Sequence, residues 1–127
     1  GQTGLAVNVM SFGFKYGLPL EADLVMDVRF LPNPFYVEGL KQQSGLDQPV
    51  QDYLNSFPVT HTFEEKLFDL LGFLLPHYVE EGKSILTLAI GCTGGRHRSV
   101  ALTHAAAAWL REQGYTVSEY HRDMTRT

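Results

Sequence analysis

The stretch that decides the fold is Ser84-Ile-Leu-Thr-Leu-Ala-Ile90, followed by Gly91 and by Cys92-Thr-Gly-Gly-Arg-His-Arg-Ser99. The first seven residues form a nearly continuous apolar run, which is typical of a buried central strand. Residues 98–113 repeat apolar side chains at helical spacing and end before Gly114, a residue type that favours helix C-termini. The sequence therefore predicts a buried strand, a glycine-rich loop and a helix in direct succession.

The flanking sequence predicts further strands and helices. Residues 5–11, 22–30 and 115–121 are strand candidates, and residues 49–55 fit a short helix. Residues 31–48 carry two prolines and two glycines and are expected to form a long loop, a kind that is usually functional or mobile. Because strands alternate with helices, we expect an α/β fold: one domain over residues 1–127, with a partly parallel sheet flanked by helices.

A second, longer helix is expected after residue 61. Thr62 and Glu65 match a capping box, in which each side chain bonds the other residue's main-chain amide. Apolar side chains recur at helical spacing from Phe63 to Tyr78. Pro76 lacks an amide hydrogen, so the pattern predicts a kink or an early end there, and Gly82 closes the element.

Composition restricts the functional classes. The chain has 127 residues, 44% of them hydrophobic, which fits one globular domain. Its single cysteine, Cys92, cannot form an internal disulfide, which favours a reducing, cytoplasmic setting. No apolar run approaches the ~18 residues that span a bilayer, so no membrane partner is expected. The net charge of −4 argues against a general attraction to nucleic acid.

The glycine-rich loop predicts an anion site. Paired glycines allow successive amides to point inward, and the following helix adds its own unpaired amides and the positive end of its dipole. Arginine can grip two phosphate oxygens at once. The alternative is a plain turn between strand and helix. Such a turn has no need of the two arginines, the histidine and the two hydroxyl side chains that this loop carries. The candidate ligand-binding residues of the loop are Cys92, Thr93, Gly94, Gly95, Arg96, His97, Arg98 and Ser99.

An enzymatic alternative uses the same loop. Cys92, Gly95, Arg98 and Ser99 fit the pattern C-x-x-G-x-x-R-[ST], which resembles the phosphate loop of cysteine-dependent phosphatases. A thiolate would attack phosphorus there, and Asp27 is the imaginable acid. Two features argue against this hypothesis, since Gly91 stands where those enzymes usually carry histidine and no conspicuous acid loop is present. Whether the chain is an enzyme stays open.

Three candidate ligand-binding residues lie outside the loop: Lys15, Asp27 and Arg29. Lys15 follows a predicted strand and either reaches the pocket or is a solvated surface charge. Arg29 either contacts the ligand or pairs with Asp27 as a structural ion pair. The histidines have no metal-ligand spacing relative to Cys92 or to each other, so neither a metal nor another cofactor is predicted.

Four motifs in order suggest a specific family. They are Ser11-Phe-Gly-Phe-Lys-Tyr-Gly17, Asp27-Val-Arg-Phe-Leu-Pro-Asn-Pro34, Gly45-Leu-Asp-Gln-Pro49 and Ile90-Gly-Cys-Thr-Gly-Gly-Arg-His-Arg-Ser-Val100. Together they resemble the C-terminal domain of the RapZ/YvcJ family of bacterial cytoplasmic nucleotide-binding proteins and RNase adapters. Family members also carry an N-terminal P-loop domain. Nothing here matches its G-x-x-x-x-G-K-[ST] motif, so the resemblance does not imply nucleotide hydrolysis by this chain.

The resemblance implies several properties. The fold would be similar to a subdomain of phosphofructokinase, and self-association into a homo-oligomer is expected. In the enterobacterial branch the domain senses glucosamine-6-phosphate, an amino-sugar phosphate, and it binds small RNAs that it presents to an endoribonuclease. Carried over by motif, the ligand pocket comprises Asp27, Cys92, Thr93, Gly94, His97 and Arg98.

The chain departs from that branch at two places. Phe35 stands where the enterobacterial members have histidine, which removes one polar ligand contact. Their domain also ends in a Lys/Arg-rich tail that contacts RNA, whereas the candidate RNA-contacting residues here are only His121, Arg122 and Arg126. Neutralising several phosphates requires more cations than this tail has, so RNA binding is in doubt.

Overall fold

A computed structural model describes residues 4–126 and contains a parallel sheet with the strand order β2-β3-β1-β4. β3 is central and buried, as its apolar sequence predicts. All of its pairings and those of β1 are parallel, so the sheet is fully rather than partly parallel. The strands are β1 (Ala6–Gly13), β2 (Leu24–Asp27), β3 (Ile85–Cys92) and β4 (Thr116–His121).

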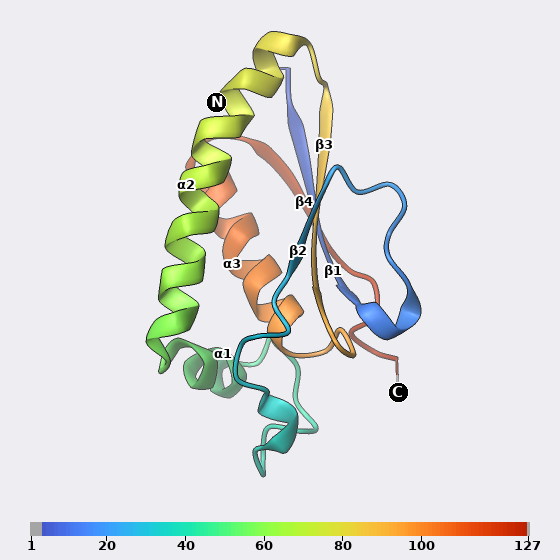
Figure 1. Cartoon of the computed structure of the whole chain (residues 1–127), viewed down its shortest axis with the longest axis vertical. Helices are drawn as coiled ribbons and strands as arrows, with labels where there is room; N and C mark the ends of the chain where they lie inside the picture. Colours follow the sequence, from blue (N-terminus) through green and yellow to red (C-terminus); the bar gives the residue numbers. More distant parts are fainter. Residues whose placement is uncertain (1–3, 127) are drawn as a thin grey trace.

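The α-helices cover one face of this sheet. They are α1 (Gln48–Asn55), α2 (Pro58–Glu81) and α3 (Arg98–Glu112), and Figure 1 shows them on the same side. Alternate side chains of β1 and β3 point toward them, so that Val7, Val9, Leu86, Leu88 and Ile90 are almost fully buried. The α/β class with flanking helices is therefore confirmed.

The opposite face of the sheet is covered by a connecting segment rather than by an α-helix. Residues 14–23 cross this side, beginning with the short 3₁₀ helix η1 (Phe14–Tyr16). A small second core of Met10, Phe12 and Ala89 lies beneath them. Phe12 also explains why position 91 is glycine, because a Cβ at Gly91 would lie 2.4 Å from the Phe12 ring.

Helix α2 corrects two predictions. It begins at Pro58 rather than at a Thr62 cap, because proline at the first helical position is preorganised and has no amide hydrogen to leave unpaired. The helix also continues through Pro76 to Glu81, so the early end is wrong. Leu71 and Leu75, which precede Pro76 in the helix, are both buried, and their packing offsets the hydrogen bond that proline removes. Gly82, with a φ of 95°, closes the helix as predicted.

The strand predictions are right in place and less accurate in length. β2 is only Leu24–Asp27, although the predicted range was 22–30. The amide of Val28 still bonds the Gly91 carbonyl at 2.9 Å, so the pairing continues one residue beyond the strand. The long loop contains the 3₁₀ helix η2 (Pro34–Tyr36).

The carboxyl ends of the parallel strands meet at one edge. Gly13 pairs with Cys92, and Asp27 pairs with Gly91. The segments that follow these strands therefore gather at the lower end of Figure 1, near the C-terminus. Open α/β sheets bind ligands at this edge. No helix within residues 4–126 is long and apolar enough to cross a bilayer.

Candidate anion-binding site

A cavity of about 420 Å³ opens at the carboxyl edge of the sheet. Five of its described lining residues are Lys or Arg, and no described lining residue is Asp or Glu. The lining combines the glycine loop, η1, η2, the segment after η2 and the C-terminal tail. The lining residues are Lys15, Tyr16, Asn33, Phe35, Tyr36, Lys41, Gln42, Cys92, Thr93, Gly94, Gly95, Arg96, His97, Arg98 and Arg126.

The loop between β3 and α3 is held in place by its carbonyls, not by its amides. The Thr93 carbonyl accepts from the Lys15 amide at 3.2 Å, and the Arg96 carbonyl accepts from the Gly45 amide at 2.9 Å. The amides of residues 94–97 have no acceptor among the described residues. His97, the N-cap of α3, makes no side-chain capping bond either. The loop thus keeps the main-chain donors that bind anions at helix N-termini.

The two loop glycines have different roles. Gly95 has a φ of 83°, and an added Cβ would lie 2.6 Å from the Gly13 amide nitrogen and 2.9 Å from the Asp123 Cβ. Glycine is therefore required there for both conformation and space. Gly94 lines the cavity, and an added Cβ at this position meets nothing within 4 Å.

Arg98 is nearly buried, with 5% of its surface exposed. Its Nη1 donates to the carbonyls of Arg29 at 2.7 Å and Leu31 at 3.1 Å, and its Nη2 donates to Thr93 Oγ1 at 3.4 Å. Its Nε, also buried, has no partner among the described residues. Buried polar atoms nearly always have a hydrogen-bond partner, so this donor is a candidate contact for a ligand acceptor.

Arg96 and His97 attach the segment after η2 to the loop. The Arg96 guanidinium donates to the Gln43 carbonyl at 3.0 Å and also to the Gln42 carbonyl. The His97 Nε2 lies 3.2 Å from the Lys41 carbonyl. Burial lowers the pKa of His97, which favours a neutral ring that donates this hydrogen bond.

Cys92 and Ser99 pack together beneath the loop. The Cys92 Sγ donates to Ser99 Oγ at 3.1 Å, and both residues are buried. Cys92 lines the cavity, whereas Ser99 is not among the lining residues.

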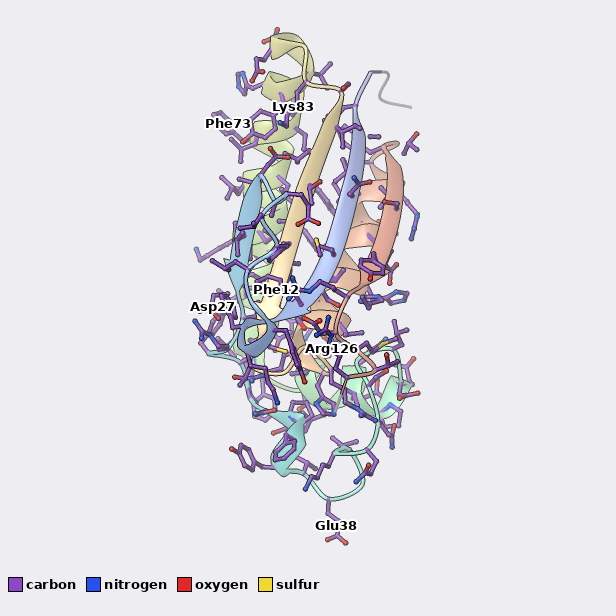
Figure 2. The ribbon with its side chains drawn as sticks, turned by 90° about the vertical axis from the view of Figure 1, so that its right-hand side faces the viewer. Phe12, Asp27, Glu38, Phe73, Lys83 and Arg126 are labelled. Carbon is purple, nitrogen blue, oxygen red and sulfur yellow. The ribbon has the colours of Figure 1, made fainter. Side chains whose placement is uncertain are left out.

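Asp27 and Arg29 lie beside the cavity without lining it. Arg29 Nη2 lies 2.6 Å from Asp27 Oδ2, and the Arg29 guanidinium lies 3.9 Å from the Phe14 ring centre. The hydrogen bonds from Arg29 lower the pKa of Asp27, and the positive charge of Arg98 acts in the same direction. Figure 2 shows Asp27 and Arg126 on either side of Phe12 at this edge.

The C-terminal tail is anchored by a fully buried carboxylate. Asp123 accepts from the Gly13 amide at 2.8 Å and pairs with Arg122 and Arg126, each at 2.9 Å. His121 bonds Ser11 Oγ at 2.8 Å and Glu119 Oε2 at 2.7 Å. Of the three candidate RNA-contacting residues, only Arg126 lines the cavity.

Several lining residues were not among the sequence candidates. The aromatic rings of Tyr16, Phe35 and Tyr36 form part of the wall, together with Lys41. For Phe35, Tyr36 and Lys41, the signal that could have indicated them is the long loop of residues 31–48, which carries η2 and returns to the glycine loop at Gly45.

The fold and this arrangement define a class: a parallel α/β domain with a glycine loop between a central strand and a helix, open to a cationic cavity. Within this class, the chain belongs to the RapZ C-terminal domain family, whose family model matches residues 5–125.

Curated relatives support this membership. A nucleotide-binding protein of Symbiobacterium thermophilum is 61% identical over 120 residues, which cover 94% of this chain and 40% of the relative. A nucleotide-binding protein of Carboxydothermus hydrogenoformans is 57% identical over 122 residues, covering 96% and 42%. A nucleotide-binding protein of Limosilactobacillus reuteri is 58% identical over 120 residues, covering 94% and 41%. The chain spans about two-fifths of the length of these relatives.

Proposed function

We propose that this chain is a regulatory domain that binds a phosphorylated metabolite at the loop of residues 94–98, with an amino-sugar phosphate such as glucosamine-6-phosphate as the first candidate. The observation that carries the proposal is that the Nε of buried Arg98 and the amides of residues 94–97 have no hydrogen-bond partner within residues 4–126. The residues that carry these donors line a cavity whose described lining has cations and no carboxylate.

A phosphate group matches these donors chemically. It carries up to two negative charges and several acceptor oxygens, which can accept from the loop amides and from Arg98 Nε together. The N-terminus of α3 adds the positive end of the helix dipole. Arg98 is already oriented by the carbonyls of Arg29 and Leu31, so binding needs little side-chain ordering.

Asp27 is the proposed partner for a sugar amine or hydroxyl. Arg98 donates to the carbonyl of Arg29, two residues after Asp27, at 2.7 Å, which brings this carboxylate near the proposed phosphate position. Asp27 now pairs with Arg29, but both side chains are about half exposed, and exposed ion pairs are weak. A ligand amine can therefore replace Arg29 at this carboxylate.

The wider role is part of the same proposal. Family resemblance supports a cytoplasmic regulator that self-associates and that binds small RNA for an endoribonuclease. In this chain the tail cation that lines the cavity is Arg126, whereas Arg122 also donates to the Gly17 carbonyl at 2.6 Å. We therefore propose that RNA contact, where it occurs, depends more on Arg126 than on His121 or Arg122.

Calorimetric titration with glucosamine-6-phosphate and inorganic phosphate tests the binding proposal. Arg98→Ala should weaken binding by at least tenfold, which is about 1.4 kcal/mol. Gly94→Ala should weaken it without unfolding the domain, since its methyl group enters open space. Arg111→Ala is the matched control on the same helix, outside the cavity lining. Unchanged affinity in both site variants would reject the proposed site.

The phosphatase hypothesis remains the second candidate because the Cys92–Ser99 hydrogen bond places a hydroxyl beside the thiol. The lowered pKa of Asp27 counts against it, since a general acid must be protonated at the working pH. Assays with a range of sugar phosphates distinguish the two functions. A phosphatase loses all turnover in Cys92→Ser and retains its ligand, whereas a sensor shows no turnover in the wild type.

A further inference from the structure

The cavity carries more positive charge than one phosphate requires. Lys15, Lys41, Arg96, Arg98 and Arg126 line it, and a phosphate monoester neutralises at most two of them. Asp123 offsets part of the charge of Arg126 but also pairs with Arg122. The whole chain is acidic, with a net charge of −4, so this concentration of cations is local to the cavity.

The cations at the mouth of the cavity are paired with aromatic rings. Lys15 Nζ and the Arg126 guanidinium lie 5.2 Å and 4.7 Å from the centre of the Tyr16 ring. Lys41 Nζ lies 4.6 Å from the centre of the Phe35 ring. The mouth therefore has two aromatic groups, each with cations beside it.

The two aromatic residues of η2 line the cavity and are also exposed to solvent. Phe35 is 45% exposed and Tyr36 is 82% exposed, and their ring centres lie 5.3 Å apart in an edge-on arrangement. Exposed rings at the wall of a polar pocket are suited to stacking on a flat ligand ring. Phe35 stands at the position where the sequence departs from the enterobacterial pattern.

We infer that the site also accepts a larger phosphorylated ligand, a diphosphate ester with a flat ring, such as a nucleoside diphosphate or its sugar ester. This inference rests on the proposed function, since the glycine loop and Arg98 hold the first phosphate. Lys15, Lys41 and Arg126 bind the second phosphate, and the base stacks on the rings of η2. A monophosphorylated sugar uses the loop but has no second phosphate for these three cations and no base for the rings of η2.

The size of the site favours a free nucleotide over an RNA strand. Single-stranded RNA is usually held in a groove whose cations follow the backbone over several nucleotides. Here the cations converge on a cavity of about 420 Å³, within the range of roughly 300–1,000 Å³ that is typical of small-ligand pockets.

A ligand series in calorimetry tests the inference on the wild-type chain. The probes are inorganic phosphate, pyrophosphate, uridine diphosphate and adenosine diphosphate. Pyrophosphate should bind about tenfold more tightly than phosphate, because it adds charge-assisted hydrogen bonds. Each nucleoside diphosphate should bind about tenfold more tightly again, because of base stacking.

Variants assign each increment to its residues. Lys41→Gln should reduce the increase in affinity from phosphate to pyrophosphate. Phe35→Leu or Tyr36→Leu should reduce only the increase in affinity from pyrophosphate to the nucleotides. Lys66→Gln and Phe73→Leu, which change the same residue types on α2 outside the cavity lining, are the matched controls and should change neither.

Each step of the series can overturn the inference separately from the proposed function. Equal affinity for phosphate and pyrophosphate would overturn the second phosphate site. Equal affinity for pyrophosphate and nucleotides, or full nucleotide affinity in both η2 variants, would overturn the stacking. A wild type that binds no anion would instead reject the proposed function itself.

Discussion

The glycine loop of residues 92–99 and the C-terminal tail of residues 121–126 meet at the same edge of the sheet, and both contain arginine and histidine. In the tail, the buried carboxylate of Asp123 pairs with Arg122 and Arg126. In the loop, Arg98 meets only neutral carbonyls and a hydroxyl, and its Nε has no partner among the described residues. The number of cations in a segment therefore does not by itself indicate an anion site. A cation that already pairs with a carboxylate of the protein is less available to a ligand than one that bonds only neutral groups.

Gly95 lies where the loop packs against the tail, and its substitution is expected to have the largest effect on stability. Gly95→Ala forces a side chain into the left-handed region and toward the Gly13 nitrogen, 2.6 Å away. Backbone strain and overpacking together should lower the free energy of unfolding by about 4 kcal/mol. Chemical denaturation measures the loss.

Gly94→Ala is the control for this prediction, because it adds the same methyl group one residue earlier in open space. Its free energy of unfolding should stay within about 1 kcal/mol of wild type. Equal stability of the two variants would contradict the close packing of Gly95 against Gly13 and Asp123.

Asp123→Ala is expected to have the next largest effect. It removes a fully buried carboxylate and leaves the Gly13 amide and two guanidinium groups without it. A loss of about 3 kcal/mol in unfolding free energy is expected, at the lower end for a broken buried pair, because Arg126 is half exposed. Denaturation of Asp123→Ala beside Asp69→Ala, an exposed carboxylate on α2, measures it. Similar losses in the two variants would contradict an anchoring role for Asp123.

The sequence predicted the central strand, the glycine loop and helix α3 well, because each has a strong local signal. Apolar continuity indicated β3, and helical spacing with Gly114 indicated the end of α3. The start of α2 was missed because two local signals competed. Proline at the first helical position prevailed over the capping box at Thr62.

The site was less predictable than the fold because contacts distant in sequence determine which side chains are available. Asp27 and Arg29 pair with each other beside the cavity, an alternative that the sequence left open. Lys41 and the rings of η2 line it because the long loop returns to the start of α3, where the Gly45 amide bonds the Arg96 carbonyl and the Arg96 side chain bonds the Gln43 carbonyl. No local pattern encodes that contact.

Arg126 and Arg122 allow a smaller test within the tail. Arg126 lines the cavity, so Arg126→Gln should weaken phosphate binding by about threefold, as expected for a partly exposed charge contact. Arg122→Gln should leave the affinity unchanged and lower stability instead, because Arg122 pairs with Asp123 and the Gly17 carbonyl. Calorimetry and thermal denaturation of both variants separate these effects. Equal losses of affinity would place Arg122 at the ligand as well.

The smallest predicted effect is a pH dependence from His97. Burial lowers its pKa in the folded chain below the ordinary value of 6.5, so the unfolded chain binds more protons in the interval below pH 6.5. Stability from the neutral ring is therefore present above pH 6.5 and declines as the pH falls toward the lowered folded pKa. Thermal denaturation between pH 7.5 and pH 5.5 should show this decline in the wild type. His97→Gln should show less of it, while His77→Gln, an exposed site on α2, should follow the wild type. A wild-type profile that rises toward pH 5.5 would contradict the buried neutral ring and the Lys41 contact assigned to it.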